Sequence, residues 1–179
     1  MKYCTNCFLP STKPQLTFDE NGVCSACLNY WNRPNIDWKK RKDTFLNIIN
    51  EIKKNQSNNW DCVVPVSGGK DSTWQVIKCL QNNLVPLAVT WKCPSRTLIG
   101  QKNLDNLISL GIDHFDITIN PKIERKFILK AFKKTGSPAV PMHLAIFNLA
   151  DRLATKFKIP LIVWGENSAK EYGFGNKAD

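Results

Sequence analysis

The stretch Val63-Val64-Pro65-Val66-Ser67-Gly68-Gly69-Lys70-Asp71-Ser72-Thr73 decides the fold and locates the candidate site. Its apolar first part is typical of a buried strand, and a helical pattern begins at Asp71. Two glycines at a strand-to-helix turn let the backbone approach a bound group closely and point successive N–H groups inward. Because the following helix adds its N-terminal N–H groups and the positive end of its dipole, the turn is predicted to bind an anion.

Polar side chains in the same turn suit a phosphorylated ligand. Ser67, Ser72 and Thr73 offer hydroxyl groups, and Asp71 is placed to hold a divalent metal against phosphate oxygens. The motif is not a Walker loop, which needs Gly at position 64 and Ser or Thr after the lysine, where this chain has Val64 and Asp71. The alternative interpretation is a plain glycine turn whose Asp and Ser only cap the helix.

Strand and helix patterns alternate along the rest of the chain. A helix is expected at residues 37–54, ahead of the first strand, and four strands follow with helices between them. This order predicts an α/β fold, a doubly wound parallel sheet with ligands at the carboxyl ends of its strands. The expected strands are 60–66, 86–91, 114–119 and 160–164, and the expected helices after the first strand are 71–83, 98–110, 122–134 and 142–158.

Two Cys-x-x-Cys pairs stand near the N-terminus. Cys4, Cys7, Cys24 and Cys27 have the spacing of a small four-thiolate zinc ribbon. Two disulfides, or four reduced buried thiols, are the alternatives. The residues before Cys4 leave no room for a signal peptide, so we expect a cytoplasmic protein, whose reducing surroundings favour metal over disulfides. Because all four ligands are protein thiolates, the zinc is expected to be structural.

Composition sets wider limits. With 179 residues and 42% hydrophobic content, the chain is expected to form one domain plus the small ribbon. It contains no apolar run near the roughly 20 residues that a membrane span needs. The net charge of +10 suits an anionic partner such as ATP, a sugar nucleotide or RNA. The basic residues are spread along helices, however, so a solvated face is the favoured explanation.

The segment from Ser67 to Ser72 resembles the pyrophosphate loop of the PP-loop ATPases. That superfamily includes GMP, NAD, asparagine and argininosuccinate synthetases, tRNA-thiolating enzymes and sugar amidotransferases. The resemblance implies a Rossmann-like fold with ATP and Mg²⁺ as cofactors. It also implies cleavage of ATP between its α and β phosphates, adenylation of a carbonyl oxygen and displacement of AMP by a nitrogen or sulfur nucleophile. The residues it places at the phosphates are Ser67, Gly68, Gly69, Lys70, Asp71, Ser72 and Thr73, with catalytic roles for Asp71 and Ser72.

Further segments narrow the resemblance. The ribbon, the loop, Thr90-Trp91, Trp164-Gly165-Glu166-Asn167 and Glu171-Tyr172-Gly173 resemble the N-acetyl sugar amidotransferases of lipopolysaccharide O-antigen synthesis. That family converts an acetamido group to an acetamidino group, which implies an N-acetylated sugar substrate, expected to be nucleotide-linked. Members of the family are longer, so this chain is expected to be an N-terminal portion. Its expected parts are a ribbon at 1–33, a linker helix at 34–57 and an ATP-binding α/β domain at 58–179.

The same resemblance adds candidate site residues beyond the loop. It implies that Thr90, Gly165 and Asn167 contact the nucleotide. Glu166 is the remaining catalytic candidate, with the tasks of orienting the substrate, binding metal or taking a proton from ammonia. Its alternative is a helix-capping acid.

The source of nitrogen is expected to be a partner. His114 and His143 have no cysteine in a matching context, so the chain shows no glutaminase pair, and His114 is expected to be structural. The resemblance implies a separate glutamine amidotransferase subunit that supplies ammonia.

Two other functions remain open at this stage. A tRNA-thiolating enzyme of the same superfamily would fit the ribbon and the basic charge, but it needs a cysteine pair near the active site. The loop at 136–141 has none, and Cys93 stands alone, which makes nucleic acid the less favoured partner. The third interpretation is an inactive zinc-ribbon binding module.

Overall fold

The computed structural model describes residues 1–54 and 59–166. The chain divides into two compact units, with residues 1–45 in the first and residues 46–165 in the second. Among the described helices, none is long and apolar enough to cross a membrane.

The second unit is built on a parallel sheet of four strands in the order β3-β2-β1-β4. Cys62 of β1 pairs with Pro86 of β2 on one side and with Leu161 of β4 on the other. Since the strand order reverses between β1 and β4, the switch point where such sheets bind ligands lies at the carboxyl end of β1. The strands are β1 Cys62–Pro65, β2 Pro86–Trp91, β3 Asp113–Ile117 and β4 Leu161–Ile162.

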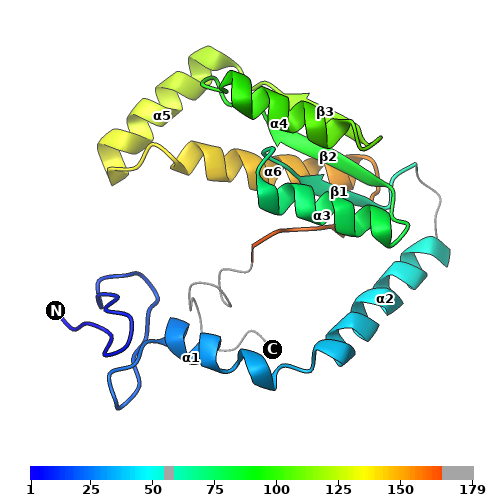
Figure 1. Cartoon of the computed structure of the whole chain (residues 1–179). Coiled ribbons are helices and arrows are strands. Elements are labelled where there is room, and N and C mark those ends of the chain that lie inside the picture. Colours follow the sequence, from blue (N-terminus) through cyan, green and yellow to red (C-terminus); the bar gives the residue numbers. More distant parts are fainter. Residues whose placement is uncertain (55–58, 167–179) are drawn as a thin grey trace. The chain divides into compact units, whose positions relative to one another are not determined.

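Helices cover both faces of this sheet, which confirms the predicted doubly wound α/β fold. Figure 1 shows α3 and α4 on one face and α6 on the other. The helix α2 (Trp38–Lys54) precedes β1, and its Lys53 forms an ion pair of 2.6 Å with the buried Asp61. The helices that follow the first strand are α3 Lys70–Gln81, α4 Leu98–Ile108, α5 Pro121–Thr135 and α6 Val140–Lys156.

The face under α6 holds the apolar core of this unit. Rings of Trp60, Phe115 and Phe157 meet edge to face, with centroids 5.3 to 6.2 Å apart. Fully burying an aliphatic or phenylalanine side chain stabilises a domain by about 1.5–3 kcal/mol, and these three rings are partly buried. The buried members of the cluster are Val63, Leu87, Val89, Ala150, Ala154 and Ile159.

The last strand is shorter than its sequence pattern predicts. Only Leu161 and Ile162 of the expected strand 160–164 pair with β1. The N–H of Val163 still donates to the carbonyl of Val63 at 2.9 Å, so the chain continues beside β1 without a regular ladder.

The first unit contains the two cysteine pairs. Antiparallel bridges join Tyr3 to Pro10 and Phe18 to Cys24, and the short helix α1 (Ser25–Trp31) follows. A 3₁₀ turn, η1 (Arg33–Asn35), occupies part of the segment between α1 and α2. The small apolar core of the first unit consists of Cys4, Leu16, Val23, Cys24 and Cys27.

Candidate functional site

The predicted loop lies at the carboxyl end of β1, at the switch point of the sheet. Val66 extends the strand by one step, because its N–H donates to the carbonyl of Val89 at 2.8 Å. The chain then turns through Ser67 and Gly68, and α3 begins at Lys70 with Gly69 as its N-cap. Within the described residues no side chain caps this helix, so the N–H groups of its first turn are open to a ligand.

Gly68 allows the loop to lie directly against α4. Its φ is +77°, a left-handed conformation that side chains disfavour. A Cβ at this position would lie 3.1 Å from the backbone nitrogen of Leu104 and 3.4 Å from the carbonyl oxygen of Gly100. Both the positive φ and the close approach to the α4 backbone therefore require glycine at this position.

Two of the three hydroxyl groups of the loop, those of Ser72 and Thr73, are engaged with the backbone. Ser72 Oγ donates to the carbonyl of Gly69 at 3.1 Å, and Thr73 Oγ1 donates to the same oxygen at 3.0 Å. Ser72 is buried, and its Oγ also accepts from the N–H of Ser67 at 3.4 Å. Backbone N–H groups, together with the hydroxyl of the exposed Ser67, are thus the donors that this turn presents to an anion.

The two charged residues at the start of α3 are exposed and pair with each other. Lys70 Nζ lies 2.6 Å from Asp71 Oδ1, and the side chains are 88% and 73% exposed. The hydrogen bond to Asp71 raises the pKa of Lys70. An exposed pair of this kind contributes little to stability, so either side chain is free to turn to a bound metal or phosphate.

Thr90, predicted to contact the nucleotide, is buried at the end of β2. Its Oγ1 donates to the carbonyl of Val66 at 2.8 Å and lies 2.9 Å from Nε2 of His114 on β3. Burial lowers the pKa of His114, and nearby Arg96 lowers it further against the opposing effect of Asp116. The Thr90 hydroxyl is therefore committed to the end of β1, and direct contact with a nucleotide stays a prediction.

An ion pair beside Thr90 was not foreseen from the sequence. Arg96 donates to both carboxylate oxygens of Asp116, at 2.6 and 2.7 Å, and its side chain is 13% exposed. The pairing lowers the pKa of Asp116. Arg96 also donates to Gln101 of α4 at 2.9 Å, so it fixes the connection between β2 and α4. Twenty residues separate the two partners, and no local motif marks either of them.

The predicted residues after β4 are only partly within the described structure. Gly165 lies against α3, because a Cβ there would overlap the side-chain amide nitrogen of Gln75. Glu166 is exposed and is grouped with the first unit. Asn167, Glu171, Tyr172 and Gly173 lie outside the described residues.

The four N-terminal cysteines come together in the first unit. Their sulfur atoms lie within 4.8 Å of one another, with Cys4 to Cys27 at 3.9 Å and Cys7 to Cys24 at 3.5 Å. Four thiolates around zinc, each with a Zn–S distance of about 2.3 Å, would be roughly 3.8 Å apart. The cluster is therefore compatible with a zinc ribbon.

Hydrogen bonds favour the thiolate form of Cys4 in particular. Cys4 Sγ accepts from the backbone N–H groups of Cys24, Asn6 and Cys7 at 3.2, 3.4 and 3.5 Å. Burial opposes ionisation of Cys4, but these donors outweigh it and lower its pKa to about 6. Cys27 Sγ accepts from the side-chain amide of Asn6 at 3.2 Å. Both sets of hydrogen bonds favour thiolate charge, whereas burial and the neighbouring cysteines raise the pKa of Cys7, Cys24 and Cys27.

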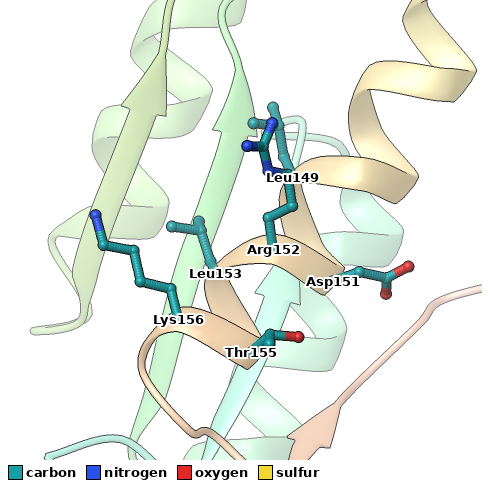
Figure 2. A pocket seen from close by; sticks show the side chains of 6 residues that line it. All are labelled: Leu149, Asp151, Arg152, Leu153, Thr155 and Lys156. Carbon is teal, nitrogen blue, oxygen red and sulfur yellow. The ribbon is translucent and has the colours of Figure 1, made fainter.

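A separate pocket lies on α6, away from the loop. Figure 2 shows it on the last turns of that helix, and its volume is about 570 Å³. Because α6 leads directly to the start of β4, these turns lie near the amino ends of the strands, whereas the loop lies at the carboxyl end of β1. The lining residues are Leu149, Asp151, Arg152, Leu153, Thr155 and Lys156.

Comparison with known proteins identifies the fold. No protein-family model and no curated protein sequence matches the chain. NMN synthetase from Francisella tularensis is similar in structure, with a TM-score of 0.53 and 17% identity over 74% of this chain and 56% of that one. The NH₃-dependent NAD synthetase from Campylobacter jejuni has a TM-score of 0.56 and 19% identity over 78% of this chain and 62% of that one.

These similarities confirm the predicted fold, an α/β unit with a parallel sheet. The chain spans less than two thirds of the length of either structure. At these identities the comparison shows the shared fold and leaves the reaction to be argued from the site.

Asp71→Ala should weaken binding of MgATP at least 10-fold, about 1.4 kcal/mol, if Asp71 holds the metal against the phosphates. The free energy of unfolding should change little, because the side chain is exposed. Isothermal calorimetry on the purified chain measures the first quantity and urea denaturation the second. The matched control is Asp151→Ala on α6, which should bind MgATP as the wild type does. Equal affinity of the Asp71 variant and the wild type would remove Asp71 from the site.

Proposed function

We propose that the chain carries the ATP site of an amidotransferase that acts on an N-acetylated sugar in the cytoplasm. The enzyme would convert the acetamido group to an acetamidino group and release AMP and pyrophosphate, for the synthesis of a surface polysaccharide. The observation that carries the ATP site is the turn from Ser67 to Gly69, with Gly68 in a left-handed conformation against α4 and the start of α3 open. The similarity to an NH₃-dependent synthetase supports a reaction of this type.

An amide carbonyl is a poor electrophile, so it has to be activated before ammonia adds to its carbon. In the first step the amide oxygen bonds to the α-phosphorus of ATP while the bond to the bridging oxygen breaks and pyrophosphate leaves. Ammonia then adds to the imidate carbon, the carbon–oxygen bond breaks, and AMP leaves with the electron pair as a proton is lost. The result is an amidine.

The loop would act mainly on the first step. Charge develops on the departing pyrophosphate, and the uncapped N–H groups at the start of α3 would be fixed donors for it. Asp71 would hold Mg²⁺, which neutralises phosphate charge when bound. Ser72 would keep its hydroxyl at the same turn, where it also holds the backbone of Gly69.

The second step is assigned to residues after β4. We place Gly165 and Asn167 at the nucleotide and Glu166 at the incoming ammonia, as orienting group or proton acceptor. This part of the proposal rests on the sequence resemblance. A separate glutamine amidotransferase subunit would supply the ammonia.

The cysteine cluster is assigned a structural zinc ion. Cys4, Cys7, Cys24 and Cys27 supply four sulfur ligands at tetrahedral spacing and leave no open position for substrate. The zinc would hold together a unit whose apolar core is small.

Release of AMP tests the proposed reaction. Protein extended to the length of the family, supplied with ATP, Mg²⁺, ammonia and an N-acetylated sugar nucleotide, should release AMP and pyrophosphate only when the sugar is present. The sugar product should be lighter by the difference between an oxygen atom and an NH group. Glu166→Gln should reduce turnover more than affinity for ATP, if Glu166 serves the second step.

The competing function makes the opposite forecast in the same assay. A tRNA-thiolating enzyme would release AMP in response to tRNA, and Cys93 would be essential. Cys93 is half-buried, and its Sγ lies 3.1 Å from Ser95 Oγ. Stimulation by tRNA and by no sugar would overturn the amidotransferase assignment.

A further inference from the structure

A row of hydrogen bonds connects β3 to the phosphate-binding turn. It begins at His114 Nε2, which lies 2.9 Å from Thr90 Oγ1, and Thr90 Oγ1 donates to the carbonyl of Val66 at 2.8 Å. That carbonyl shares a peptide group with the N–H of Ser67, which donates to Ser72 Oγ at 3.4 Å. The row ends where Ser72 Oγ donates to the carbonyl of Gly69 at 3.1 Å. It therefore crosses from the sheet into the first turn of α3.

The direction of every bond in the row follows from its acceptors. A carbonyl oxygen has no proton, so the Thr90 hydroxyl must give its single proton to Val66. The Thr90 oxygen is then left with acceptor capacity only, and His114 must donate to it from Nε2. This fixes Nε2 as a protonated nitrogen of His114. The same reasoning assigns the Ser72 proton to Gly69, so all donors point from β3 toward the loop, an arrangement in which neighbouring bonds strengthen one another.

We propose that His114 is a positioning residue for the phosphate-binding turn, acting through Thr90 on the peptide group between Val66 and Ser67. The inference rests on the proposed ATP site. Both ends of that peptide group are held, its carbonyl by Thr90 and its N–H by Ser72. Its orientation sets the direction in which the chain enters Gly68, and hence the direction of the N–H groups that follow.

Burial makes the row difficult to replace. Val66 and Thr90 are each 6% exposed and Ser72 is 9% exposed, so water has little access to the groups between them. Without the Thr90 proton, the Val66 carbonyl would be buried and unpaired, which the glycine turn could relieve by rotating the peptide group. Such a rotation would redirect the donors of the loop away from the phosphates.

Matched substitutions separate the hydrogen bond from the bulk of the side chain. Thr90→Val and His114→Leu remove the bond, and each should weaken MgATP binding about 10-fold, the effect of losing one buried hydrogen bond. Thr90→Ser and His114→Gln keep a donor at the required place and should bind within about 3-fold of the wild type. The double variant Thr90→Val with His114→Leu should be no weaker than the weaker single variant, because both cut the same row. His143→Leu, at an exposed histidine on α6, is the control and should leave the affinity unchanged.

Unchanged affinity in His114→Leu, or a loss in His114→Gln as large as that in His114→Leu, would overturn the inference.

A second measurement works without ATP and without variants. The ¹⁵N chemical shifts of the His114 ring, in the wild-type protein above the pKa of the imidazole, should show the proton on Nε2 and none on Nδ1. The opposite tautomer would contradict the row. Failure of the wild type to bind MgATP would instead overturn the proposed function. The two failures can be told apart, because the tautomer of His114 is measured without ATP.

Discussion

Gly68→Ala should abolish measurable binding of MgATP at micromolar protein concentrations. A side chain at φ +77° costs about 1–2 kcal/mol, and the new Cβ would press on the backbone nitrogen of Leu104 from 3.1 Å. A backbone atom inside α4 has little freedom to move, so the turn itself must shift. Moving the loop by even a fraction of an ångström misdirects its N–H groups, and we expect an affinity loss of roughly 100-fold or more, about 2.7 kcal/mol. Isothermal calorimetry measures it.

Gly111→Ala is the matched control for this substitution. Gly111 follows α4 with φ +85°, and a Cβ there would have no neighbour within 4 Å among the described residues. Both variants should therefore lose a similar free energy of unfolding from backbone strain, and only the Gly68 variant should lose MgATP. Equal affinities in the two variants would show that the contact with α4 does not position the loop.

Cys4→Ser should release the zinc and unfold the first unit. Cys4 accepts three backbone hydrogen bonds in the cluster, so its loss removes one metal ligand and the anchor of the turn around it. The remaining core is small, and a structural zinc contributes about 10–16 kcal/mol to the folding of such units. Elemental analysis should fall from about one zinc per chain to near zero, and amide exchange in residues 3–30 should become fast.

Cys93→Ser is the control, because Cys93 lies outside the cluster. It should keep the zinc and the slow exchange. The second unit should retain its own unfolding transition in both variants, since its core contains none of the four clustered cysteines. Iron in place of zinc, disulfides in the protein as isolated, or a full zinc content in Cys4→Ser would contradict the assignment.

The order of strands and helices was predictable from the sequence, because local patterns carry it. The apolar run before Ser67 and the glycines after it mark a strand, a turn and a helix in consecutive residues, and the structure has β1, the loop and α3 there. The four cysteines were equally readable from their spacing. The register and the order β3-β2-β1-β4 depend on contacts between distant segments, which no single pattern contains.

Other features of the site depend on pairs of residues that are distant in sequence. Arg96 and Asp116 meet because β2 and β3 pair in parallel, and neither residue stands in a motif. The sequence predicts a structural His114, and only the geometry shows that its Nε2 reaches Thr90. The apolar pattern of α5 predicts its helix. Its Ile123, Phe127 and Phe132 are nevertheless 62%, 44% and 52% exposed. Periodicity identifies the apolar side of a helix, but it does not tell how much of that side the neighbouring elements cover.

The most direct test of the ATP site is a titration of ¹⁵N-labelled protein with Mg²⁺ and the α,β-methylene analogue of ATP, which the enzyme would not cleave between those phosphates. The account predicts that the backbone amide signals of Gly68, Gly69 and Lys70 shift most, because these N–H groups would meet the phosphates at the start of α3. Saturation with those three signals unmoved, or with the largest shifts at the α6 pocket, would contradict it.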